Sequence, residues 1–333
     1  MHQHHHLYAI GNALVDTEYE VSDELLKTMG VSKGHMTLID ADQRTDLLKH
    51  LSGHHPRRTG GGSAGNTVVA LAQLGGKAFY SCRVADDELG AFYTSDLQAN
   101  GVNTNLLHTK ANSGQTGSCL VLVTPDAERS MCTFLGETSK LDGNALHPLD
   151  IAKSKIFYME GYLAASPTGL KAALEGLSTA KDHGLATALT LSDVSMINFC
   201  RPGLEAMVGD GVTYLFANEE EAQTWCGSTD LDVVIPQLQK IAKTVCLTRG
   251  PEGCIISSRG QVSHVPAEAT EAVDTNGAGD MFAGAFLYGI THGMPEGKAA
   301  ALANAAASAV VSQHGNRLTT EKLKHILSQF LYL

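Results

Sequence analysis

The sequence predicts an α/β fold in which a central, mostly parallel sheet is covered by helices on both faces and a small second sheet lies to one side. Three observations predict it. Strand-like and helix-like stretches alternate regularly from residue 66 onward. From residue 277 the chain is helical almost to its last residue. Before the alternation begins, the segment 17–40 mixes short β-prone pieces with a helical patch, which favours a small sheet outside the main one.

The individual elements follow from the apolar periodicity and the turn residues. The expected strands cover 7–14, 77–84, 117–124, 129–135, 155–159, 186–191, 212–216 and 244–247, and a hairpin is expected from 253–257 and 261–265. The expected helices cover 66–74, 87–100, 167–183, 219–226, 233–241, 277–292, 295–313 and 319–331. No internal repeat and no low-complexity linker divides the chain. One domain over 7–333 is therefore predicted.

The composition is that of an ordinary globular enzyme, and it argues against two kinds of partner. The chain has 333 residues, 43% of them hydrophobic, so its core needs no metal or disulfide. The net charge is −11 and no basic run exceeds Arg57-Arg58, which argues against a nucleic acid partner. No apolar stretch approaches the roughly 18 residues that span a bilayer, which argues against a membrane.

The cysteines and the first residues also carry information. Seven dispersed cysteines, with no C-x-x-C pair, indicate reduced thiols and a cytoplasmic protein. The chain opens with Met1-His2-Gln3-His4-His5-His6, which resembles the remnant of a purification tag. Residues 1–6 are therefore excluded from the chemistry.

The strongest local signal is Asp-Thr-Asn-Gly-Ala-Gly-Asp at 274–280, which is followed by an apolar helical run. Small residues before a helix leave backbone N–H groups open to an anion, and the helix N-terminus adds partial positive charge. Asp280 does not suit a phosphate ligand there, because like charges repel. It suits a base that accepts the proton of an attacking hydroxyl. The alternative is an ordinary helix N-cap.

A second glycine-rich string, Gly60-Gly61-Gly62-Ser63-Ala64-Gly65-Asn66, leads into an expected helix. Consecutive glycines let a ligand or another segment approach the backbone closely. The same string would also suit the start of a dinucleotide-binding fold, but no acidic residue ends the next strand near position 84. The sequence contains no Gly-x(4)-Gly-Lys-Ser/Thr string, so a P-loop nucleotidase is set aside.

Together the two glycine strings resemble the two signature motifs of the ribokinase-like (PfkB-type) carbohydrate kinases, in the family's order and over nearly the whole chain. The segment 274–280 matches the family's Asp-Thr-x-Gly-Ala-Gly-Asp without departure, and 61–66 resembles its substrate-side glycine motif. Asn218-Glu219-Glu220-Glu221 is similar to its Asn-x-x-Glu motif. Gly11-Asn12-Ala13-Leu14-Val15-Asp16 and Glu128-Arg129-Ser130-Met131 resemble the adenosine kinase branch.

This resemblance implies a ribokinase-like αβα sandwich with a β lid formed by about 17–40 and 115–135. It also implies a kinase that transfers a phosphoryl group from ATP to a primary hydroxyl of a nucleoside or a sugar. Asp280 would be the general base, and the N–H groups of Gly277, Ala278 and Gly279 would form the anion hole. Arg129 would lie near the transferred phosphate, and the alternative for it is an exposed strand arginine.

The resemblance places ATP and its metal along the later strands. Asn218, Thr248, Gly250, Gly253 and Asn304 would line the ATP site. Glu221 would act on Mg²⁺ largely through water, which suits an ion that keeps its hydration shell. Without the resemblance, 219–221 would be the solvated acidic start of a helix. A monovalent cation such as K⁺ near Asp274 is left open.

On the acceptor side, Asp16 follows the first strand and offers two acceptor oxygens to neighbouring hydroxyls of a sugar ring. Without the resemblance it would be a routine turn residue. The remaining acceptor-binding residues are expected to be Asn12, Gly61, Gly62, Ser63 and Asn66.

Three questions stay open at this point. The acceptor is a nucleoside of the adenosine type or a free sugar. The rival classes are a dinucleotide-binding oxidoreductase, which lacks its acidic ribose ligand, and a non-catalytic sensor, which would be expected to lose Asp280. The protein is a monomer or a homodimer that pairs through the edge of the lid sheet.

Overall fold

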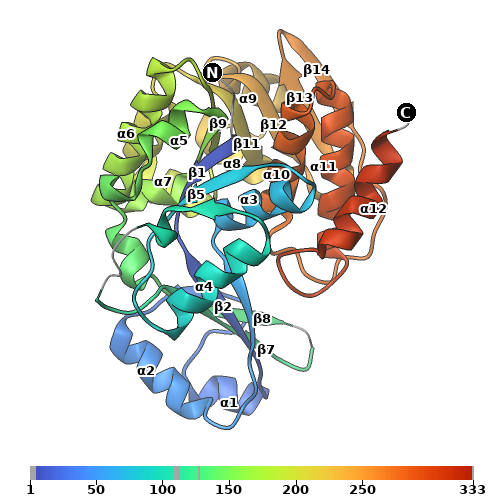
Figure 1. Ribbon diagram of the computed structural model, residues 1–333. Coiled ribbons are helices and arrows are strands. Elements are labelled where there is room, and N and C mark those ends of the chain that lie inside the picture. The colour runs from blue at the N-terminus through green and yellow to red at the C-terminus, as the bar shows by residue number, and fades with distance from the viewer. Residues whose placement is uncertain (1–4, 109–112, 127, 332–333) are drawn as a thin grey trace.

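The computed structural model describes residues 5–108, 113–126 and 128–331 and contains two sheets. Within these residues, nine strands form one sheet in the order β14-β13-β12-β11-β10-β9-β1-β5-β6, and five form another in the order β3-β8-β7-β2-β4. Figure 1 shows helices on both sides of the large sheet and the small sheet at one end of the molecule. The predicted α/β sandwich with a small second sheet is confirmed.

The elements have the following bounds. The large sheet contains β1 (His5–Ile10), β5 (Ala78–Ser81), β6 (Asn103–Thr104), β9 (Ser154–Glu160), β10 (Ala186–Thr190), β11 (Val212–Asn218), β12 (Ala242–Thr248), β13 (Cys254–Ser258) and β14 (Gln261–Val265). The small sheet contains β2 (Leu14–Glu20), β3 (Met36–Leu38), β4 (Arg57–Gly61), β7 (Ser118–Val123) and β8 (Arg129–Phe134). The helices are α1 (Asp23–Thr28), α2 (Ala41–His50), α3 (Ser63–Gln73), α4 (Glu88–Ala99), α5 (Pro148–Ala152), α6 (Pro167–Asp182), α7 (Val194–Val208), α8 (Glu219–Cys226), α9 (Leu231–Leu238), α10 (Ala278–Thr291), α11 (Glu296–Val311) and α12 (Thr320–Leu331).

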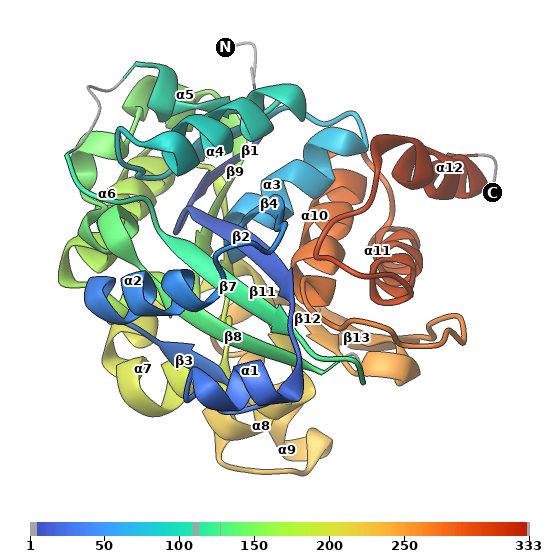
Figure 2. The same ribbon diagram turned by 90° about the horizontal axis from the view of Figure 1, so that it is seen from below.

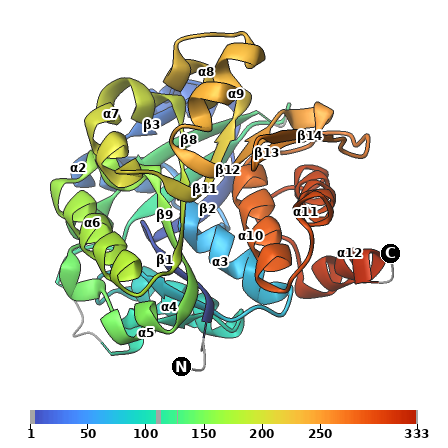
Figure 3. The same cartoon turned by 90° about the horizontal axis from the view of Figure 1, so that it is seen from above.

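The large sheet is buried on both faces because its strands are apolar on both sides. In β1, Leu7 and Ala9 face one hydrophobic core, and Tyr8 and Ile10 face the other. Helices α3, α4, α10, α11 and α12 close the first core. Helices α5 to α9 close the second, and Figure 3 shows α6 and α7 on one side of the strands and α10 and α11 on the other.

The carboxyl ends of the parallel strands lie along one edge of the large sheet. Strands β5, β1, β9, β10, β11 and β12 are parallel to one another, and only β13 and β14 among the described strands of this sheet run antiparallel to their neighbours. From β1 the chain passes through the small sheet to β5 on one side, whereas β9 lies on the other side. The loops after β1 and β9 therefore diverge, and such a switch point is where ligands bind in open α/β sheets.

The small sheet has one face covered by its own helices. Tyr19, Leu122 and Cys132 pack there against Leu26 of α1 and Leu47 of α2. Figure 2 looks onto this part of the molecule, with β2, β7 and β8 crossing in front of the large sheet. The two segments expected to form the lid contribute β2, β3, β7 and β8.

Several local predictions need correction. The single strand expected over 7–14 is two strands, because β1 ends at Ile10 and β2 begins at Leu14 in the other sheet. A Cβ at Gly11 would lie 2.6 Å from both the Ala64 Cβ and the Glu160 carboxylate, so only glycine fits where the chain crosses between sheets. The prediction that residues 1–6 are a tag remnant outside the fold also needs correction. Residues 1–4 lie outside the described residues, but His5 and His6 begin β1.

Among the elements of the described chain that were not predicted, three have a sequence that explains why. Strand β4 reads Arg-Arg-Thr-Gly-Gly and has no apolar alternation. Helix α2 is mostly polar, and its only strong signal is the capping box between Asp40 and Gln43. Helix α7 contains Pro202 and is kinked at Cys200, which interrupts its pattern. No helix in the described parts of the chain is long and apolar enough to cross a membrane.

Helices α3 and α10 pack against each other at very short range, and this contact sets the spacing of the residues at their N-terminal ends. A Cβ at Gly284 of α10 would lie 2.6 Å from the carbonyl oxygen of Thr67 and 2.7 Å from the Cβ of Ala70, both in α3. The two helices are this close because Gly284 has no side chain. A larger residue would push them apart.

Gly284→Ala should therefore lower the free energy of unfolding by about 1–3 kcal/mol, through overpacking between α3 and α10. Gly297→Ala is the matched control, since nothing lies within 4 Å of a Cβ at this exposed helical position. It should be neutral or stabilising by up to about 1 kcal/mol, because alanine favours a helix more than glycine does. Denaturant unfolding of the two variants checks this, and equal midpoints would contradict it.

Candidate active site

Asp280 lies in the first turn of α10 and accepts hydrogen bonds from two residues of α3. The Ser63 hydroxyl donates to Oδ1 at 2.6 Å, and the Asn66 amide donates to Oδ2 at 2.9 Å. The two glycine-rich strings, separated by more than 200 positions in the sequence, therefore meet at one half-buried carboxylate.

The surroundings of Asp280 adjust its basicity in opposite directions. Desolvation raises the pKa of Asp280, and the hydrogen bonds from Ser63 and Asn66 and the charge of Arg317 oppose that rise. The carboxylate is therefore a better proton acceptor than an exposed aspartate, while its donors stabilise the ionised form. These are the properties that a general base requires.

The N-terminus of α10 is shaped for an anion. Gly277 has φ +77, and a Cβ there would lie 2.7 Å from the carbonyl oxygen of Asn316, so this position requires glycine. A Cβ at Gly279 would meet nothing within 4 Å, which shows that the approach to this turn is open. The Ala278 N–H donates only a long bond, 3.3 Å, to the carbonyl of Thr275. The first N–H groups of a helix have no intrahelical acceptor, so this turn suits a negatively charged group.

Two glycines of the other string are needed where the small sheet meets α3. A Cβ at Gly61 would lie 2.6 Å from the Asp16 carboxylate, across the pair of strands β2 and β4. Gly62 has φ +85, and a Cβ there would collide with the carbonyl oxygen of Asn12. Gly61 and Gly62 thus bring Asp16 and Asn12 against the start of α3.

Asp16 projects from β2 toward the same region. Its Oδ2 accepts a hydrogen bond from the Asn316 amide at 2.8 Å. Desolvation raises the pKa of Asp16 to about 7, and the charges of Arg317 and Arg129 oppose this rise. The structure therefore brings Asn12, Gly61, Gly62, Ser63 and Asn66 together around Asp16 and Asp280, and the contact of these residues with the acceptor stays a prediction.

Arg129 joins the small sheet to the loop before α10. Its guanidinium donates to Asp274 and to Glu18, each at 2.7 Å. The Asp274 carboxylate also accepts from the N–H groups of Asn276, at 3.0 Å, and Gly315, at 2.9 Å. Arg129, expected at the transferred phosphate, and Asp274, expected near a monovalent cation, are therefore hydrogen-bonded to each other. Arg129 at the transferred phosphate and a cation near Asp274 stay predictions.

On the ATP side, Asn218 and Thr248 are opposite each other at the ends of β11 and β12. Glu221 forms a capping box with Asn218, accepting from its backbone N–H at 3.2 Å and its amide at 2.8 Å. Burial raises the pKa of Glu221 to about 7. These contacts stabilise the N-terminus of α8. They also place carboxylate and amide oxygens, which can bind a metal ion, at the carboxyl edge of the sheet.

Two residues expected at ATP have evident structural tasks. The buried Asn304 donates to the carbonyls of Val265 and Pro266, at 2.8 and 3.2 Å, and so holds the end of β14. Gly253 has φ +87 and packs against the Val265 carbonyl. Gly250, with φ +54, lies in the turn after β12 and has open space around it. The contact of these residues with ATP stays a prediction.

Glu160, which is fully buried at the end of β9, was not predicted as a site residue. One carboxylate oxygen accepts from the N–H of Asn12 at 2.7 Å and the other from the N–H of Ala64 at 2.8 Å. Glu160 thus joins the loop after β1 to the first turn of α3. An acidic residue directly after an apolar strand was the available signal.

Two further residues, Asn316 and Arg317, come from the loop between α11 and α12. Asn316 contacts Asp16, and the Arg317 Nε donates to the Asn66 Oδ1 at 2.9 Å. Nothing in their local sequence distinguished them from other loop residues.

The buried Glu160 should make the stability depend on pH. Burial raises its pKa from 4.5 to about 7. Between these values the folded protein holds a proton that the unfolded chain has released, so stability falls as pH rises. The free energy of unfolding of the wild type should therefore fall, relative to that of Glu160→Gln, from about pH 4.5 to about pH 7.

Urea unfolding across this pH range measures the difference. Glu20→Gln is the control for the loss of one carboxylate, because Glu20 is exposed on β2. A difference between wild type and Glu160→Gln that stays constant with pH would contradict the prediction.

Comparison with known proteins agrees with this geometry. The solved structure of an adenosine kinase from Sinorhizobium meliloti is similar to this chain, with a TM-score of 0.87 and 36% identity over 98% of this chain and 99% of that one. A probable sugar kinase protein from Rhizobium etli CFN 42 has a TM-score of 0.88 and 34% identity, with 99% of both chains covered. An adenosine kinase from Schizophyllum commune is 30% identical over 316 residues, which cover 86% of this chain and 89% of that protein.

The family is shown by a match over most of the chain. Residues 27–323 match the family described as "pfkB family carbohydrate kinase". That range contains both glycine-rich strings, the Asn218–Glu221 segment and the Arg317 loop. The chain belongs to the pfkB family of carbohydrate kinases, and it is therefore a phosphotransferase whose acceptor is a hydroxyl group.

Proposed function

We propose that this kinase transfers the terminal phosphoryl group of ATP to the 5′ hydroxyl of a nucleoside of the adenosine type. The observation that carries the proposal is the face of the small sheet on which Asp16 lies. That face combines the Asp16 carboxylate, suited to a ribose diol, with apolar side chains suited to a base. The named adenosine kinases among the similar proteins support the same acceptor.

The strand register defines this face. Asp16 is opposite Cys119, Cys119 is opposite Thr133, and Thr133 is opposite Leu38. Residues opposite one another in neighbouring strands project to the same side of a sheet. The four side chains therefore form one row across β2, β7, β8 and β3.

The next row on this face is mostly apolar. It contains Glu18, Val121, Met131 and Met36, in the same strand order. Large apolar side chains are uncovered at the far end of both rows, since Leu38 is 61% exposed and Met36 is 49% exposed. Such uncovered apolar surface commonly marks a binding site.

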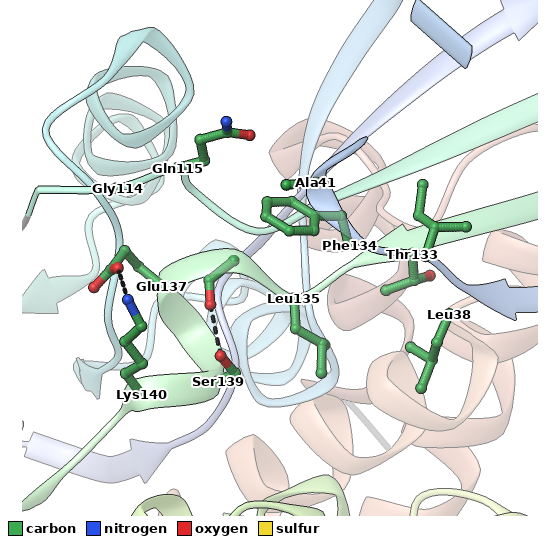
Figure 4. Close-up of a pocket in the computed structure, with 12 residues that line it drawn as sticks. Leu38, Ala41, Gly114, Gln115, Thr133, Phe134, Leu135, Glu137, Ser139 and Lys140 are labelled. Atoms are coloured by element: carbon green, nitrogen blue, oxygen red, sulfur yellow. Dashed lines mark hydrogen bonds and ion pairs between the residues drawn. The ribbon is translucent and has the colours of Figure 1, made fainter. Parts of the chain in front are cut away.

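A cavity of about 480 Å³ lies at the Leu38 end of the Asp16 row. Figure 4 shows Leu38, Phe134 and Leu135 around it, with the ion pair of Glu137 and Lys140 at the opposite end. Cavities of roughly 300–1,000 Å³ with a mainly apolar lining typically hold small ligands. A ribose on Asp16 would direct its base along the row toward this cavity.

The chemistry then follows from the position of Asp280. With the ring diol on Asp16, the exocyclic CH₂OH is the group left to face Asp280. The carboxylate takes the hydroxyl proton while that oxygen bonds to the γ-phosphorus, and the bond from phosphorus to the ADP oxygen breaks. The N–H groups of 277–279 stabilise the negative charge that develops, and Arg129 would add to this if it exchanged its carboxylate partners for phosphate.

The donor set near ATP fits Mg²⁺. This ion keeps several waters and is held mainly by substrate phosphates with one or two carboxylates. Glu221 and Asn218 supply a carboxylate and an amide oxygen at the sheet edge, and Glu221 would act on the ion through water. For K⁺ near Asp274 the fit is poorer, because the Arg129 guanidinium already forms an ion pair with the Asp274 carboxylate.

We also propose a cytoplasmic location. All seven cysteines are free thiols, which suits the reducing cytoplasm.

The oligomeric state depends on the edges of the small sheet. This sheet ends in β3 on one side and β4 on the other. A homodimer would pair along one of these edges, and a monomer is the alternative.

Asp280→Asn should lower kcat by roughly 10²–10⁴-fold, because an amide cannot accept the hydroxyl proton. The dissociation constant for ATP should change little, since the variant keeps the size of the side chain. Steady-state kinetics with adenosine and ATP, together with ATP titration calorimetry, measure both quantities. Asp42→Asn, on α2, is the control. If Asp280→Asn retained more than about a tenth of the rate, Asp280 would not be the base.

The acceptor is tested with a pair of nucleosides. At about pH 8, where Asp16 with its pKa of about 7 is mainly ionised, a 2′-deoxynucleoside should show a kcat/KM roughly 10- to 100-fold lower than its ribo counterpart, because it loses a hydrogen bond to the Asp16 carboxylate. Asp16→Ala should remove most of this discrimination, and Glu20→Ala, farther along β2, should preserve it. Equal rates on both nucleosides would rule out the diol contact. Turnover of free sugars alone would establish the sugar kinase alternative.

A further inference from the structure

A chain of hydrogen bonds leads to Asp280 from the loop between α11 and α12. The Arg317 Nε donates to the Asn66 Oδ1 at 2.9 Å, and the Asn66 Nδ2 donates to Asp280 at 2.9 Å. We propose that Arg317 is a positioning residue that holds the Asn66 amide in the one orientation that supports Asp280. The proposal rests on the proposed role of Asp280 as the base.

The orientation matters because an amide carries a donor and an acceptor of nearly equal size. If the Asn66 amide turned over, its oxygen would face the Asp280 carboxylate and the two would repel. Arginine has five N–H donors and no acceptor. Arg317 can therefore hydrogen-bond to the Asn66 amide only when the amide oxygen points toward it. Asn66 is 5% exposed, and water therefore gives a turned amide little compensation.

Arg317 is itself held in place from its other side. Its Nη1 forms an ion pair with Asp96 of α4 at 2.5 Å, and its side chain is only 10% exposed. A Cβ at Gly60 would lie 2.9 Å from both terminal nitrogens of Arg317 and would collide with the Asp96 carboxylate. A side chain at Gly60 would therefore displace the Arg317–Asp96 ion pair.

The charge of Arg317 has a second effect. It opposes the rise in the pKa of Asp280 that desolvation causes. Among the described residues, the other ionisable side chains whose pKa the charge of Asp280 affects are Asp16 of β2, Tyr158 and Glu160 of β9, Tyr162 after β9 and Glu221 of α8. None of these is a cation, so removal of Arg317 should raise the pKa of Asp280.

The test is a double-mutant cycle with ATP and either adenosine or D-ribose, whichever the wild type phosphorylates. Above the acid limb of the pH–rate profile, Arg317→Met and Asn66→Ala should each lower kcat by roughly tenfold or more. The double variant should be no slower than Asn66→Ala alone, because Arg317 acts through Asn66. The KM for ATP should stay within about twofold in all three, since a positioning effect on the acceptor side leaves uniform ATP binding intact.

Two further variants separate orientation from charge and from general stability. Arg317→Lys keeps the positive charge, so its acid limb should stay at the wild-type pH while kcat remains reduced, whereas in Arg317→Met the limb moves to higher pH. Arg58→Met is the matched control, because Arg58 also pairs with a carboxylate of α4, Glu88, and should leave kcat unchanged. If Arg317→Met does not fold, Arg317→Lys takes its place in the cycle.

Additive effects of the Arg317 and Asn66 substitutions on kcat would overturn the proposal, as would a wild-type kcat in Arg317→Met. An equal loss in Arg58→Met would also overturn it, because the effect would then be one of general stability. Failure of the proposed base is recognised separately, by an Asp280→Asn protein that keeps its activity.

Discussion

The site depends on how a carboxylate withdrawn from water, Asp280, obtains its hydrogen-bond donors. Desolvation opposes the charge of Asp280, so the ionised form needs the bonds from Ser63 and Asn66. These donors lie on α3 and the carboxylate on α10, and the short contact at Gly284 brings the two helices together. Each helix follows an N-cap glycine with positive φ, Gly62 before α3 and Gly277 before α10, and neither glycine has a side chain that could cap the helix. The Glu160 carboxylate accepts the Ala64 N–H in the first turn of α3, so the first turn of α10 is the one left open to a negatively charged substrate.

Several buried carboxylates lie at the same edge of the sheet, although burial of carboxylates destabilises a protein core. The pKa values of Asp16, Glu160 and Glu221 are all raised to about 7 by removal from water. Each has a separate reason to be there: Asp16 is proposed to bind the acceptor, Glu160 joins the loop after β1 to the first turn of α3, and Glu221 forms the capping box of α8. Arg317 and the backbone N–H groups offset part of this repulsion. Functional sites in proteins commonly hold groups at a cost that the rest of the fold compensates.

The small sheet contributes directly to the site and does not only cover it. It carries Asp16 on β2, and the row of side chains that continues from Asp16 across the same face ends at the exposed Leu38. Arg129 connects this sheet to Asp274 in the loop before α10, so a change in the position of the sheet would alter the surroundings of the anion-binding turn. An ion pair between Arg129 and Asp274 thereby links the small sheet to the loop before α10.

The sequence by itself determined the α/β class, most helices and strands, and the two glycine-rich strings with Asp16 and Asp280, because these depend on local periodicity and on short motifs. It did not show that 7–14 divides between two sheets, since the crossing at Gly11 is required by Ala64 and Glu160 from distant segments. Nor did it show Glu160, Asn316 or Arg317 as site residues. Their contacts span 96 to 300 positions, and only the packed structure brings such groups within hydrogen-bonding distance. Local sequence specifies which groups are available, but the tertiary structure decides which of them are partners, because a hydrogen bond forms only where packing has placed both atoms about 3 Å apart.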